Sequence, residues 1–76
     1  RPVVMPLSEL KSGDKAKVSY IVTKYHGRLD RLSSMGLLPG VQIRLHQRQP
    51  SYVIQMGETQ IALDTAIARD IYVRLM

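Results

Sequence analysis

The sequence contains no cysteine, tryptophan or phenylalanine. Without cysteine, the chain forms no disulfide bond, thiolate metal site or cysteine nucleophile, and it fits a reducing compartment. No apolar run approaches the roughly 18 residues that a membrane span requires, so we expect no insertion into a membrane. Residues 1–6 lack the long apolar stretch of a signal peptide. These absences predict a cytoplasmic protein.

The features that mark an active site are equally scarce. The sequence has no serine, histidine and acid arrangement in a recognisable context, and no glycine-rich loop that could cradle a phosphate. We expect Ser33 and Ser34 on the surface of a helix and Ser51 in a turn. The sequence therefore predicts neither an enzyme nor a small-molecule substrate, and it implies no cofactor.

The composition is typical of one globular domain that spans residues 1–76. Hydrophobic residues make up 45% of the chain and charged residues 22%, which argues against disorder. Internal repeats and interior linkers, which would suggest a second domain, are missing. At this length the core is thin, so we expect nearly every well-placed apolar side chain to serve the fold.

Alternation of apolar and polar residues predicts five short strands, over residues 15–20, 41–46, 52–56, 59–63 and 71–75. The first strand is expected to bury Ala16, Val18 and Tyr20 on one face, and to continue over residues 21–23 after a change of face. Gly57 opens the turn between the third and fourth strands.

A short helix is predicted over residues 28–35. Leu29 and Leu32 lie three residues apart, as on one face of a helix, and Gly36 stands where a left-handed C-cap is expected. We expect Met35 to pack this helix onto the strands, and the turn after Gly36 to lead into the second strand.

Single helical turns complete the pattern. Ser8 is expected to cap one turn, whose Leu7 and Leu10 plug one end of a barrel, and Asp64 to cap another over residues 65–68. Closing the strands into a barrel hides sheet edges that would otherwise recruit other chains. The predicted fold class is all-β, a small five-stranded SH3-like barrel with one short inserted α-helix.

Almost the whole chain resembles the FeoA family. The resemblance rests on residues 5–13 (MPLSELKSG), on residues 32–40 (LSSMGLLPG) and, more loosely, on residues 61–71. FeoA domains belong to bacterial ferrous-iron transport systems, and the same SH3-like domain ends the DtxR-type metal-dependent repressors. The central stretch consists of turn and core residues, so it identifies a scaffold and does not locate a functional site.

The resemblance implies an accessory domain that docks on the ferrous-iron transporter FeoB, through its cytoplasmic GTP-binding region, and modulates iron uptake. The alternative that it implies is the C-terminal domain of an iron-responsive transcriptional repressor, which contacts other parts of its own chain. Whether the domain associates with itself stays open, as does the direction of its effect on transport.

We expect the binding residues among the exposed arginines and tyrosines, because these side chains combine apolar area with directed hydrogen bonds. The loop and helix near residue 28 and the hairpin near residue 50 supply them. The candidates are Tyr25, His26, Arg28, Arg31, Arg48 and Tyr52.

Metal ligation is a weaker alternative. The candidate ligands are His26, Asp30, His46, Met56 and Glu58. His26 and Asp30 have the spacing of ligands on a helix, but His26 precedes the expected helix, and His46 lies on the polar face of a strand. We therefore predict no metal site.

The net charge of +5 favours an anionic partner and leaves a basic nucleic-acid-binding barrel as a further alternative. Lysines and arginines crowd the first half of the chain, but strand alternation places several of them on the solvent face. Without tryptophan or phenylalanine, the four scattered tyrosines lack the usual stacking platform for bases. We therefore rank nucleic acid below a protein partner.

Overall fold

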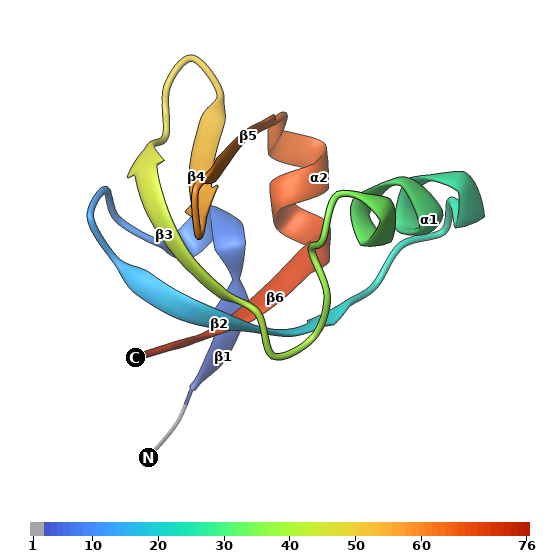
Figure 1. The fold of residues 1–76 in the computed structure, drawn as a ribbon, viewed down its shortest axis with the longest axis horizontal. Coiled ribbons are helices and arrows are strands. Elements are labelled where there is room, and N and C mark those ends of the chain that lie inside the picture. The colour runs from blue at the N-terminus through green and yellow to red at the C-terminus, as the bar shows by residue number, and fades with distance from the viewer. Residues whose placement is uncertain (1–2) are drawn as a thin grey trace.

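The structure is a computed structural model that describes residues 3–76 of the chain (Figure 1). Within that range the strands are β1 (Val4–Pro6), β2 (Lys15–Ile21), β3 (Gln42–Gln47), β4 (Tyr52–Met56), β5 (Thr59–Leu63) and β6 (Ile71–Leu75). The helices are the 3-10 turn η1 (Leu7–Glu9), α1 (His26–Ser34) and α2 (Thr65–Asp70). Among these described residues, no helix is both long and apolar enough to cross a membrane.

The strands form one antiparallel sheet in the order β1-β6-β2-β3-β4-β5. Figure 1 shows the sheet curling around the interior, with α1 projecting on the side away from the β3–β4 loop. The all-β prediction is confirmed, and the structure adds the short edge strand β1. This strand escapes prediction because three residues ending in Pro6 are too few to show alternation.

The core fills the inside of the curled sheet. Its largest fully buried side chains are Leu7, Leu10, Leu32, Leu37, Ile43, Leu45, Ile54, Ile71 and Val73. Leu7 in η1 and Leu10 at its C-cap are both fully buried and cover the interior, as predicted. Ser8, however, does not cap that turn: it lies inside η1, whose N-cap position is Pro6, without a side-chain hydrogen bond.

The register of β2 shifts between Val18 and Tyr20, so that Ser19 is an extra residue in a bulge. Side chains beyond the bulge change face. Tyr20 is therefore 47% exposed, and the prediction that it lies in the core is wrong. Its ring instead stacks on Tyr72 of β6, with the centroids 5.0 Å apart.

A Schellman motif ends α1. Gly36 has a φ of +93°, its N–H donates to the Ser33 carbonyl at 2.9 Å, and the Leu37 N–H donates to the Leu32 carbonyl at 3.0 Å. Leu32 and Leu37 are both buried and anchor the helix. Met35 is 40% exposed, so the prediction that it packs the helix onto the sheet is wrong.

Asp64 caps α2 as predicted, since its Oδ1 atom accepts the Ile67 N–H at 2.8 Å. The helix is longer than the predicted single turn, and it continues to Asp70, where β6 begins directly. Ala68 is the fully buried residue of this helix. The cap therefore fixes where the chain turns from β5 towards the final strand.

Candidate functional site

Several of the predicted binding residues meet at the beginning of α1. Tyr25 stands at the N-cap position and is 59% exposed. The Cζ atom of Arg28 lies 4.8 Å from the centroid of the Tyr25 ring, a cation–π contact. Arg31 follows three residues later, so it projects from the same side of the helix as Arg28. His26 is also exposed.

A cleft of about 460 Å³ lies between α1 on one side and the end of β5 with the start of α2 on the other. Its α1 wall includes Tyr25, Arg28, Arg31 and Met35. Asp64 and Ile67 lie on the opposite wall, while Leu32 and Leu63 are buried beneath. This helix cleft thus has an apolar floor and two arginines at its edge.

Arg28 of α1 also contacts α2. Its Nη1 atom lies 3.4 Å from Asp70 Oδ2, with the two side chains 27% and 29% exposed. Within residues 3–76 this is the one ion pair, so Arg31 has no acidic partner there. Arg28 is therefore held in place by contacts within the domain, whereas Arg31 is available to a partner.

Apolar side chains are exposed around α1. Of the α1 residues, His26–Ser34, only Leu32 is buried. Leu29, Met35 and the nearby Leu38 are each between 38% and 45% exposed. Exposed apolar side chains beside arginine are typical of protein-binding surfaces.

Arg48, in the β3–β4 loop, and Tyr52, at the start of β4, both contact η1. Figure 1 shows α1 on the side away from that loop. The Ser8 carbonyl accepts from Arg48 Nη2 at 3.0 Å and from the Tyr52 hydroxyl at 3.4 Å. Tyr52 is only 6% exposed, so the expectation that its ring is part of an exposed hairpin surface is wrong. Strand alternation places it inward with Ile54 and Met56.

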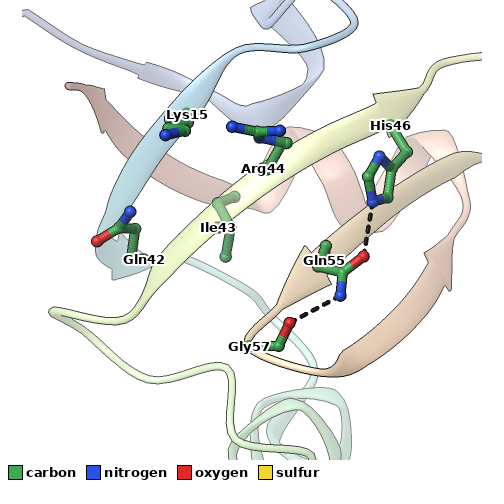
Figure 2. Close-up of a pocket in the computed structure, with 7 residues that line it drawn as sticks. All are labelled: Lys15, Gln42, Ile43, Arg44, His46, Gln55 and Gly57. Atoms are coloured by element: carbon green, nitrogen blue, oxygen red, sulfur yellow. Dashed lines mark hydrogen bonds between the residues drawn. The ribbon is translucent and has the colours of Figure 1, made fainter.

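The candidate metal ligands do not come together. Among residues 3–76, no group of three or more histidine, cysteine or acidic residues could hold a metal ion. His46 Nε2 is instead hydrogen-bonded to Gln55 Oε1 at 2.7 Å on the outer face of the sheet (Figure 2). Met56 belongs to the core.

The sequence did not predict that basic residues pair directly across β2, β3 and β6 on the outer face of the sheet. Lys15 and Arg44 lie side by side across β2 and β3, beside a hollow of about 420 Å³ (Figure 2). Alternation indicates that these side chains face outward. Only the pairing register brings them together, and the sequence alone does not specify that register.

Residues 5–75 match the family model of the FeoA domain. The chain belongs to the FeoA family. It is 33% identical to a solved structure described as iron uptake regulatory protein (FeoA), with a TM-score of 0.86, and the match covers 97% of this chain and 99% of that chain. A search of curated proteins finds no match.

Other solved structures share the fold of this FeoA domain. The FeoA protein from Chlorobium tepidum is 25% identical, with a TM-score of 0.87, over 95% of this chain and 70% of that chain. T. acidophilum IdeR is 26% identical, with a TM-score of 0.89, over 100% of this chain and 36% of that chain. The predicted SH3-like fold and the resemblance to both FeoA proteins and metal-dependent repressors are confirmed.

Proposed function

We propose that this FeoA domain is a protein-binding module that docks on the cytoplasmic GTPase region of FeoB through the helix cleft. Membership of the FeoA family supports a role in ferrous-iron transport. The observation that carries the choice of surface is the cleft itself, whose apolar floor lies between α1 and α2 with Arg28 and Arg31 at its edge.

This geometry suits a partner segment with an apolar side chain flanked by carboxylates. The apolar side chain would fill the cleft above Leu32 and Leu63, and a carboxylate would meet Arg31, which lacks an acidic partner among the described residues. Docking modulates transport only if the cleft binds one conformation of FeoB more tightly than another, because a ligand shifts an equilibrium by its difference in affinity.

The test is calorimetric titration of the purified FeoB GTPase region with the domain and its variants. Arg31→Glu is expected to weaken binding by about tenfold or more, because arginine is among the residues whose substitution in an interface costs the most binding free energy. Arg48→Glu is the matched control, with the same charge change at the other end of the molecule. Unchanged affinity for Arg31→Glu and for Leu29→Asp would overturn this surface assignment.

The likeness to IdeR supports a second candidate function. The whole chain superimposes on 36% of IdeR, so the same domain also forms the smaller part of a repressor. In that setting the helix cleft would dock on another segment of its own chain. The complete reading frame decides between the two, because a repressor carries a winged helix-turn-helix upstream of this domain.

A further inference from the structure

The register of β6, β2 and β3 places positive charges directly opposite one another. Lys17 of β2 is the partner of Arg74 in β6, and Lys15 of β2 is the partner of Arg44 in β3. Directly opposed side chains on one face have Cβ atoms roughly 5 Å apart, and like charges in such pairs destabilise the sheet. The domain thus holds these like-charge pairs at a cost to its own stability.

No carboxylate among residues 3–76 forms an ion pair with these charges. Strands β2, β3 and β6 contain no aspartate or glutamate. The one ion pair within residues 3–76 joins Arg28 to Asp70, on the helices. Asp14, next to β2 in sequence, accepts the Lys11 backbone N–H at 2.8 Å. The like-charge pairs therefore face solvent without a counter-charge from these strands.

Each like-charge pair borders a shallow hollow. Lys15 and Arg44 line one of about 420 Å³ (Figure 2), and Lys17 and Arg74 line another of about 440 Å³. Lys15 and Lys17 are two residues apart on one strand, which separates the hollows by roughly 7 Å along β2. Each hollow can receive one anionic group of the size of a phosphate.

Apolar and aromatic side chains border the same face. Val4 is the partner of Arg74, and Tyr20 is the partner of Tyr72, so register places all of them on the outer side. Val4 is 39% exposed, and the exposed Tyr20 stacks on Tyr72. Tyrosine beside aliphatic and basic residues is typical of surfaces at the membrane interface.

We propose that this basic face, made of Lys15, Lys17, Arg44 and Arg74 with Val4, Tyr20 and Tyr72, binds the phosphodiester headgroups of an anionic membrane. The rings of Tyr20 and Tyr72 stack on each other with their centroids 5.0 Å apart. They therefore do not offer two separate ring faces on which successive bases could stack. The two hollows share no lining residue, which suits two separate anionic headgroups better than one continuous strand. The face shares no lining residue with the helix cleft, so both surfaces can be occupied at once.

The experiment measures partition of the domain onto vesicles of equal parts phosphatidylglycerol and phosphatidylcholine, against vesicles of phosphatidylcholine alone. The double variant Lys17→Gln/Arg44→Gln removes one cation from each pair. It is expected to weaken partition by about 25-fold, because each cation near an anionic surface contributes roughly fivefold. The control variant Lys24→Gln/Arg69→Gln also removes two positive charges, one just before α1 and one in α2. It is expected to retain most of the binding to the anionic vesicles.

Thermal melting separates lost binding from lost folding. The Lys17→Gln/Arg44→Gln variant is expected to melt at the same temperature as the parent or higher, because like-charge repulsion is relieved. Equal weakening by the two double variants would overturn the proposal, as would equal binding to neutral vesicles. Tighter binding of a single-stranded oligonucleotide through the same residues would replace it with a nucleic-acid surface. None of these outcomes bears on docking to FeoB, which the assay does not contain.

Discussion

The Nη1 atom of Arg28 lies 3.4 Å from Oδ2 of Asp70, and this contact joins the beginning of α1 to the end of α2. The same guanidinium lies over the ring of Tyr25. Both charged side chains are more than a quarter exposed, so solvent screens their attraction. We infer that the pair aligns one edge of the helix cleft and adds little to the stability of the fold.

Arg28→Ala is expected to lower the free energy of unfolding by less than about 1 kcal/mol, as for other exposed ion pairs. A double-mutant cycle with Asp70→Ala, measured by urea unfolding, gives the coupling energy of the pair. A coupling above about 2 kcal/mol would contradict the screened geometry, since exposed pairs do not reach it.

Leu32→Ala is expected to lower the free energy of unfolding by about 2–5 kcal/mol, because Leu32 is the buried anchor of α1. Leu29→Ala on the same helix should cost less than about 1 kcal/mol, since Leu29 is exposed and its loss leaves no cavity. Urea unfolding of both variants checks the contrast. Similar losses for the two would mean that α1 packs differently from the structure.

Gly36→Ala and Gly27→Ala should change stability in opposite directions. Gly36 has a φ of +93°, so alanine is strained there and should cost about 1 kcal/mol or more. Gly27 lies within α1 without a positive φ, and a Cβ atom there would meet nothing within 4 Å. Alanine should therefore stabilise the helix at Gly27 by about 0.5–1 kcal/mol. A higher melting temperature for Gly36→Ala would contradict the Schellman end of α1, and a lower one for Gly27→Ala would contradict the helical placement of Gly27.

Asp64→Ala removes the acceptor of the Ile67 N–H and should cost about 1 kcal/mol of folding free energy. Asp64→Asn keeps a capping oxygen and is expected to retain most of the parent stability. Urea unfolding of the two variants tests the cap. An equal loss for asparagine and alanine would show that the charge of Asp64, and not the hydrogen bond, matters at this position.

The strands were predictable where alternation is uninterrupted. The bounds of β4, β5 and β6 agree with the predicted ranges, and the two-residue turn at Gly57 falls where the pattern breaks. The prediction that Tyr20 is buried failed because Ser19 is an extra residue in the bulge, which reverses the face of Tyr20. No local feature of the sequence marks the bulge. Met35 was misplaced because Leu37, beyond the helix, takes the buried position.

The site was predictable only within one segment. Tyr25, Arg28 and Arg31 are close in sequence, and a helix brings them to one side. The opposite wall of the helix cleft, Asp64 and Ile67, lies more than 30 positions further along the chain, and no spacing rule links it to α1. The like-charge pairs of the basic face likewise depend on register, which tertiary packing decides.

The measurement that tests the docking proposal most directly is an NMR titration of the isotope-labelled domain with the FeoB GTPase region. Docking through the helix cleft predicts saturable shifts in the amide signals of residues 25–35 and 62–67, while signals of β2 and β3 stay in place. An absence of shifts, or shifts confined to the outer face of the sheet, would contradict it.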